Sequence, residues 1–148
     1  MDSMKKGGTA LHDLKIHVKF KLSALWASVM FCYIYGDYFG LFQPGQLQAM
    51  LAGKMPPLGA TTQAVLVGTS LMMVIPSVMV FLSLALKADL NRWVNIIFGV
   101  IYSVIILITM QGSWAFYIFL GVVEVILTAL VVWYAWTWPK QEATSTGS

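Results

Sequence analysis

Four long blocks of apolar residues are the feature that most restricts how this chain can fold. They cover about residues 20–42, 62–86, 92–110 and 114–138. A helix needs about 20 residues to cross a bilayer, and each block is long enough for that. The chain is 59% hydrophobic and only 10% charged, whereas a soluble domain is about 25% charged. The sequence therefore predicts an all-α fold, a four-transmembrane-helix bundle that runs up-down-up-down.

The segments outside the blocks divide the chain into a membrane domain and two tails. We expect residues 1–19 to form a cytoplasmic N-terminal segment, residues 20–138 the membrane domain and residues 139–148 a cytoplasmic tail. Residues 11–19 (LHDLKIHVK) have the apolar spacing of a short interfacial helix, and they fit the first turns of the first span equally well. Residues 43–61 form the longest connection, where we expect one short surface helix over residues 46–52.

The distribution of basic residues predicts the orientation of the spans. With the N-terminus inside, Lys54 is the one basic residue on the outer side. The other eight lie on the inner side: Lys5, Lys6, Lys15, Lys19, Lys21, Lys87, Arg92 and Lys140. Lys and Arg collect in cytoplasmic loops of membrane proteins. We therefore predict a multi-pass protein of the inner (plasma) membrane with both termini in the cytoplasm.

Two acidic residues, Asp37 and Glu124, lie inside the apolar blocks. A charged side chain at the centre of a bilayer costs about 2.5–3.5 kcal/mol on insertion scales, so such residues usually face the bundle interior and have a partner or a task. From the helical rise, Asp37 lies about 9 Å and Glu124 about 15 Å below the outer ends of their spans. Neither has a basic residue nearby in its own span. Both are candidates for binding a ligand or a proton.

Other polar side chains are expected at a similar depth on the remaining spans. Tyr33, Tyr102, Thr69 and Ser70 all come out about 10–15 Å from the outer surface. The four helices would then enclose a ligand- or proton-binding pocket that faces outward. The alternative is that these hydroxyl groups only bridge neighbouring helices, and that water or the first loop satisfies Asp37.

Three further residues predict how the helices pack. Gly36 and Gly40 form a G-x-x-x-G pair, which lets another helix approach closely. Pro76 lacks a backbone donor, so the carbonyl group of Met72 should be left free and the second span should kink. Asp89 or Asn91 is expected to cap the third span.

Several functional classes find no support in the sequence. The histidines at positions 12 and 17 do not have the spacing of a helical metal pair, and a single cysteine, Cys32, rules out an internal disulfide. We therefore expect no metal site, and the sequence identifies no cofactor. The loops are too short for a catalytic domain, and the basic residues mark membrane edges rather than a nucleic-acid surface.

One stretch resembles a known family. Residues 30–45 (MFCYIYGDYFGLFQPG), 75–77 (IPS) and 91–95 (NRWVN) resemble an uncharacterised family of small bacterial four-helix membrane proteins. The resemblance covers residues 20–138 and implies a bacterial inner-membrane location and four spans. It implies no activity.

These observations favour a small membrane protein that binds, and in a further step transports, a small ligand or a proton through an outer-facing polar pocket. Its partners would be the lipid bilayer and an unidentified small ligand, and a carrier of this size would need a homodimer. One alternative is a non-catalytic accessory or scaffold subunit of a membrane complex. The other is a membrane enzyme acting on a lipid or quinone, which is disfavoured because no nucleophile–base pair is evident.

Overall fold

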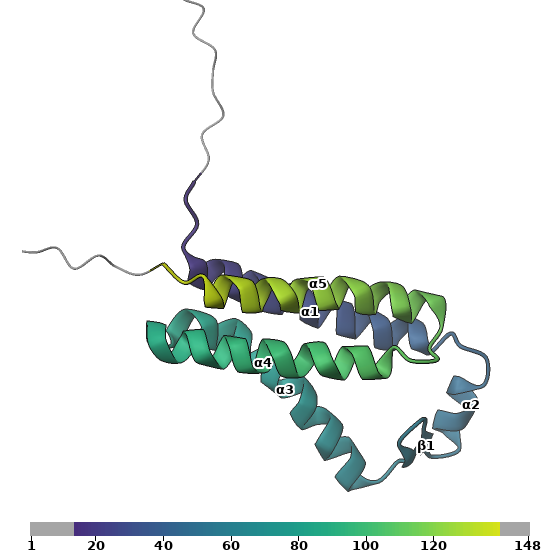
Figure 1. Ribbon diagram of the computed structural model, residues 1–148. Helices are drawn as coiled ribbons and strands as arrows, with labels where there is room; N and C mark the ends of the chain where they lie inside the picture. Colours follow the sequence, from purple (N-terminus) through teal and green to yellow (C-terminus); the bar gives the residue numbers. More distant parts are fainter. Residues whose placement is uncertain (1–13, 140–148) are drawn as a thin grey trace, which may run out of the picture.

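The computed structural model describes residues 14–139, and within them the chain is helical apart from one small hairpin (Figure 1). The elements are α1 (Val18–Gly40), α2 (Gln46–Leu51), β1 (Lys54–Met55), β2 (Gly59–Ala60), α3 (Gln63–Ala85), α4 (Ala88–Thr109) and α5 (Ala115–Trp136). The all-α class and the order of four long helices are confirmed, with boundaries within four residues of the predicted ones. The short helix in the long connection is also confirmed as α2.

The segment before α1 is not helical where the structure describes it. Residues 14–17 have no regular structure, and His17 caps α1 by accepting a hydrogen bond from the backbone of Lys19 at 3.3 Å. The interfacial helix expected over residues 11–19 is thus not formed by residues 14–17. Residues 11–13 and the two tails lie outside the described residues.

Three of the described helices, α3, α4 and α5, are long and apolar enough to cross a membrane. They make the chain a multi-pass membrane protein. Helix α1 is as long as α3, with 23 residues, but it does not belong to this group. Its C-terminal half carries Asp37 and the tyrosines Tyr33, Tyr35 and Tyr38, which lower its hydropathy.

Helix α5 packs against both α1 and α4, and α3 packs mainly against α1. Figure 1 shows the start of α1, the end of α5 and the α3–α4 turn at one end of the molecule. We call this end, at Val18, Lys87 and Trp136, the basal end. The opposite end, which carries α2 and the antiparallel β1–β2 hairpin, is the hairpin end.

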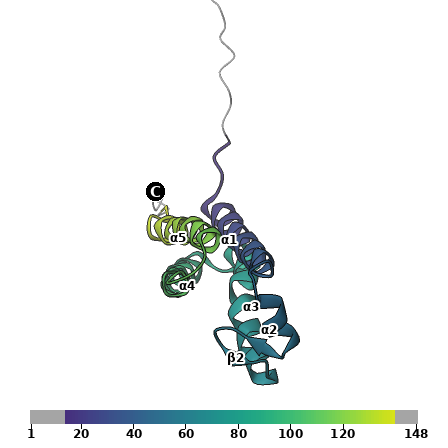
Figure 2. The same cartoon turned by 90° about the vertical axis from the view of Figure 1, so that its right-hand side faces the viewer.

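The helices bury narrow stripes against one another, but α3 does so only in its basal half. Its buried residues are Pro76, Met79 and Ser83, and none of residues 63–75 is buried. Figures 1 and 2 show that this part of α3 runs away from α1, α4 and α5 towards α2. Towards the hairpin end the packed core therefore consists of three helices.

A hydrogen-bonded network fills the basal half of the core between α1, α3 and α4. The indole nitrogen Nε1 of Trp26 donates to Oδ1 of Asn95 at 2.7 Å, and Nδ2 of Asn95 donates to Oδ1 of Asn91 at 2.6 Å. Nδ2 of Asn91 donates to the carbonyl group of Ser83 at 2.6 Å, and the Ser83 hydroxyl donates to Asn95 at 3.3 Å. The asparagines and Ser83 are fully buried. Satisfied networks of this kind fix the register of packed helices.

The expectation that Asp89 or Asn91 caps α4 is wrong. The helix begins one residue after Lys87, which makes no side-chain cap, and Asp89 lies in the first turn. The physical reason is that the side-chain amide of Asn91 forms hydrogen bonds inside the core and is therefore not available to cap the helix. Instead, the ammonium group of Lys19 closes the end of α3 by donating to the carbonyl groups of Leu84 and Leu86 at 3.2 and 2.6 Å.

The closest helix contacts are made by two glycines outside the G-x-x-x-G pair. A Cβ atom at Gly99 would lie 2.7 Å from Val132 on α5, and one at Gly121 would lie 2.6 Å from Met110. A Cβ at Gly36 would make an ordinary contact of 3.7 Å with Leu120, and one at Gly40 would meet no atom within 4 Å. The α4–α5 pair is thus the one that depends on glycine for its close approach.

Candidate functional site

Three of the residues selected from the sequence lie on different helices in the hairpin half of the core. Tyr33 is half-buried on α1, Tyr102 is buried on α4 with 2% exposure, and Glu124 is buried on α5 with 6% exposure. Counted from the hairpin ends of their helices, Tyr33 and Tyr102 lie about 10 Å deep and Glu124 about 14 Å deep. They belong to one layer of the protein.

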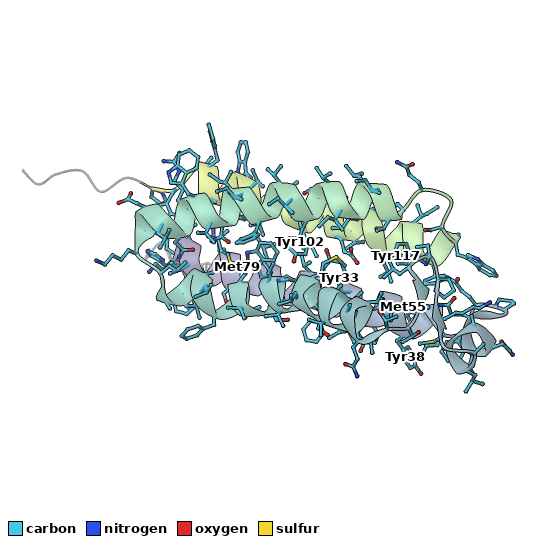
Figure 3. All side chains as sticks on the ribbon, turned by 90° about the horizontal axis from the view of Figure 1, so that it is seen from below. Tyr33, Tyr38, Met55, Met79, Tyr102 and Tyr117 are labelled. Carbon is cyan, nitrogen blue, oxygen red and sulfur yellow. The ribbon has the colours of Figure 1, made fainter. Side chains whose placement is uncertain are left out.

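The aromatic rings of this layer pack in series. The rings of Tyr33 and Tyr102 have centroids 6.4 Å apart, and Trp26 packs edge-on against Tyr102 at 5.9 Å. Figure 3 shows Tyr102, Tyr33 and Tyr117 following one another between α4 and α3 towards the hairpin end. The hydroxyl group of Tyr33 is buried and has no hydrogen-bond partner among the described residues.

Glu124 lies within electrostatic range of Cys32, Tyr33 and Asp37, which all belong to α1. Within residues 14–139, no side chain donates a hydrogen bond to its carboxyl group; the Thr128 hydroxyl donates instead to the backbone carbonyl of Glu124, at 2.9 Å. A carboxyl group without a donor is unusual in so buried a residue, because buried polar groups are almost always paired.

Asp37 differs from Glu124 in its surroundings. It lies one turn from the hairpin end of α1, about 4 Å below that end, and its side chain is exposed. It is close enough to Glu124 for the two charges to interact, but no hydrogen bond joins them. The structure thus places one acid in the core and the other at the rim of the same half of the protein.

The two hydroxyl residues in the hairpin half of α3 do not face this layer in the same way. Thr69 is half-buried and lies on the same face as Met72 and Pro76, whereas Ser70 is exposed on the other side of the helix. Both hydroxyl groups donate to backbone carbonyls of α3 itself, including that of Leu66 at 3.0 and 2.7 Å. Each is therefore satisfied within its own helix.

Tyr102 makes the contact that ties the kinked helix α3 to α4. Pro76 lies inside α3 and leaves the carbonyl group of Met72 without its helical donor. The hydroxyl group of Tyr102 donates a hydrogen bond to this carbonyl. The free carbonyl was predicted from the sequence, but its partner was not.

This arrangement predicts a specific coupling between Tyr102 and Pro76. Tyr102→Phe should lower the free energy of unfolding by about 1 kcal/mol, because the Met72 carbonyl loses its donor. In a Pro76→Ala background the new backbone N–H can serve that carbonyl, so the same substitution should cost less, with a coupling energy of about 0.5–1 kcal/mol. Detergent unfolding of the four proteins measures this coupling. Equal costs in both backgrounds would contradict the assignment.

Several contacts between cations and aromatic rings at the basal end were not predicted from the sequence. The guanidinium group of Arg92 lies between Trp93 and Trp136, with 5.8 and 5.7 Å to their rings. The ammonium group of Lys21 lies 4.9 Å from the ring of Tyr134. Aromatic and basic residues placed together are typical of the interface between lipid and water.

No other described feature competes with the polar layer as a site. Among residues 14–139, no group of three His, Cys, Asp or Glu side chains could hold a metal ion. A shallow surface depression of about 250 Å³ lies on the outer face of α1, lined by Phe31, Ile34, Tyr35 and Tyr38. These residues are all on one helix and largely exposed, so the depression is separate from the layer around Glu124.

Comparison with known proteins identifies a family but not an activity. No curated protein and no protein of solved structure matches the chain. The sequence profile of DUF6326, described as a family of unknown function, matches residues 11–145. The resemblance to an uncharacterised family is thereby confirmed, together with three helices that can span a membrane. Because the match covers most of its length, the chain belongs to the DUF6326 family of unknown function.

Proposed function

We propose that α1 is a fourth membrane span and that both termini lie in the cytoplasm. The length of α1 and its packing against α5 and α3 support a crossing parallel to theirs. The described basic residues of the basal end are Lys15, Lys19, Lys21, Lys87 and Arg92, whereas the hairpin end carries Lys54. The excess of positive charge favours the basal end as the cytoplasmic side.

Cysteine accessibility tests this topology in a Cys32→Ala background. A membrane-impermeant maleimide applied to intact cells should label Lys54→Cys in the hairpin and leave Lys87→Cys unlabelled until the cells are permeabilised. Both positions are exposed and lie outside the long helices, so they form a matched pair. Labelling of Lys87→Cys in intact cells would contradict the topology.

We further propose that the protein binds a small ligand or a proton at the layer formed by Glu124, Tyr33 and Tyr102, with Asp37 at its rim. The observation that carries this proposal is Glu124, a residue only 6% exposed whose carboxyl group receives no described hydrogen bond. The unpartnered hydroxyl of Tyr33 beside it offers a second group for the same ligand. Transport of the bound ligand is the further step of this proposal.

The free-energy cost of an unpaired acid favours a functional role for the Glu124 carboxyl group. An unpaired buried polar group costs about 1–3 kcal/mol, and a charged one in the membrane centre costs more. The basal network shows that this fold pairs buried amides well, since Asn91 and Asn95 both find partners. An acid left unpaired in the same protein is therefore best explained by a partner that is not part of the chain.

Native mass spectrometry tests the binding proposal directly. The protein isolated in a mild detergent should carry a small molecule that is absent from Glu124→Gln and retained by Asp89→Asn. The control removes an exposed acid at the basal end, so it matches the charge change without touching the layer. Identical spectra for the wild-type protein and Glu124→Gln, with or without a bound molecule, would contradict the binding of a small ligand at this layer.

A second candidate function is that of an accessory subunit in a membrane complex. The observation that favours it is the hairpin half of α3, where no residue between 63 and 75 is buried by the chain itself. A partner subunit could pack there. Crosslinking from a photoreactive residue at Leu71, which is 60% exposed, should then capture one defined protein, and capture of lipid alone would contradict this role.

A further inference from the structure

The hairpin half of α3 contributes no fully buried residue to the polar layer. The other three long helices keep buried residues in this half, namely Gly36 on α1, Ile106 on α4 and Gly121 on α5. α3 has none there, and it diverges from the other helices in both ribbon views (Figures 1 and 2). The side of the layer that faces α3 is thus the one against which the chain packs least.

Two features of the chain, a proline and a hydrogen bond beside it, support the divergence of α3. Pro76 sits where the packed half of α3 ends, since Met79 and Ser83 beyond it are buried. The hydrogen bond from Tyr102 to the Met72 carbonyl satisfies the group that a proline kink exposes. Because this bond replaces the missing helical bond, α3 can keep its bend without leaving an unpaired carbonyl in the membrane.

Apart from Gln63 at its start, the diverging segment offers an apolar surface. Its described hydroxyl residues, Thr69 and Ser70, both donate to carbonyls of α3 itself. The exposed positions after Gln63 include the apolar residues Leu66, Val67, Leu71 and Val74. A hydrated path along this helix would lack hydrogen-bond partners, whereas lipid chains are compatible with it.

The charge of the layer restricts what can bind there. Its ionisable groups are the carboxyls of Glu124 and Asp37, and the described basic residues of α1 and α4 nearest to it, Lys21 and Arg92, lie towards the basal end. The layer therefore offers an anion no basic side chain from these helices to pair with. In the same layer the rings of Tyr33 and Tyr102 pack against each other, and they suit an apolar or aromatic body.

From these observations we infer that the ligand is a molecule dissolved in the bilayer, with an apolar body and a non-anionic head that donates hydrogen bonds, and that it reaches Glu124 laterally past the hairpin half of α3. This inference rests on the proposed binding function of the layer. It adds the class of ligand and its route. A hydrophilic solute entering from water is the alternative that the experiment must separate.

Two carbodiimides of the same reactivity and opposite solubility distinguish the routes. Both modify carboxyl groups, but dicyclohexylcarbodiimide is apolar and the ethyl-dimethylaminopropyl compound is a water-soluble cation. In lipid nanodiscs we expect the apolar reagent to modify Glu124 at least about tenfold faster, because a charged reagent is excluded from the bilayer. The exposed Asp89 should react with the water-soluble reagent, and this reaction shows that the water-soluble reagent is active. Peptide mass spectrometry gives both rates.

A matched pair of substitutions tests the route along α3. Thr69→Phe places a ring on the inward face of the helix, and Ser70→Phe places the same ring on its exposed face. Each removes one hydroxyl that bonds only to α3. Thr69→Phe should slow modification of Glu124 by the apolar reagent about threefold or more, which is a modest steric effect, while Ser70→Phe should leave it unchanged.

The outcomes separate this inference from the binding proposal. If Glu124 reacts equally fast with both reagents, or faster with the water-soluble one, the site exists but opens to water, and the inference is wrong. Equal rates for Thr69→Phe and Ser70→Phe would likewise exclude a path past α3. If neither reagent modifies Glu124 while Asp89 reacts, the carboxyl is closed off and both proposals fail.

Discussion

Asn95→Leu is expected to lower the free energy of unfolding by about 2–3 kcal/mol, although it replaces a polar residue in the membrane by an apolar one of similar shape. The amide of Asn95 is bonded to Trp26, Asn91 and Ser83. Its removal leaves three buried groups without their partner, and hydrogen bonds between membrane helices are each worth about 0.6 kcal/mol on average and up to about 1.7. Unpaired donors in the core add to that loss.

Unfolding in mixed micelles with a denaturing detergent measures this loss. Ser28→Ala is the control, since the Ser28 hydroxyl bonds only to the Ala24 carbonyl of its own helix at 3.0 Å and its removal should change stability by less than about 0.5 kcal/mol. A loss for Asn95→Leu that is no larger than this control value would mean that the basal network does not hold α1, α3 and α4 together.

Glu124→Met is expected to have the opposite effect and to raise the free energy of unfolding by about 1–3 kcal/mol. The side chain of methionine has a similar length and is apolar, so it fills the place of the carboxyl group without its desolvation cost. Because no described side chain donates to Glu124, the substitution leaves no broken hydrogen bond behind. Residues kept for binding commonly lower stability in this way.

The same detergent titration measures Glu124→Met, with Thr128→Val as the control one turn along α5. The Thr128 hydroxyl is buried and accepts a hydrogen bond from Ser103 at 2.7 Å, so its removal should not stabilise the protein. If Glu124→Met is destabilising, the carboxyl group is a structural element of the core, and its interpretation as a binding group is wrong.

The helices could be predicted because their signal is local. Each apolar block has the length of a span, and helix ends within four residues follow from where the blocks stop. The free carbonyl of Met72 was equally predictable, because it depends only on Pro76 four residues later. Membrane character follows from the same local property, and α3, α4 and α5 confirm it.

Which faces of the helices pack together could not be predicted, because this depends on contacts between segments that are distant in the sequence. Gly99 and Gly121 have no special spacing, yet the steric fit of α4 to α5 depends on them. Asn91 and Asn95 are four residues apart and hence on one helical face, which indicates a shared partner, but only the fold shows that the partners are Ser83 and Trp26.

The arrangement of the polar layer was only partly predictable for the same reason. Helical depth placed Tyr33, Tyr102 and Glu124 at similar levels, and the structure brings them to neighbouring helices. Depth alone does not show which way a side chain points, and for this reason Thr69 and Ser70 looked equivalent in the sequence. The bend of α3 away from the layer depends on how Tyr102 and Pro76 meet, which no local pattern encodes.

The most direct test of a binding site at Glu124 is an experimental structure of the protein in lipid nanodiscs, isolated without removal of bound molecules. We expect non-protein density within hydrogen-bond distance of the Glu124 carboxyl and the Tyr33 hydroxyl, on the side that faces α3. A direct hydrogen bond between these two groups, with α3 packed over them and no density in between, would contradict the central claim.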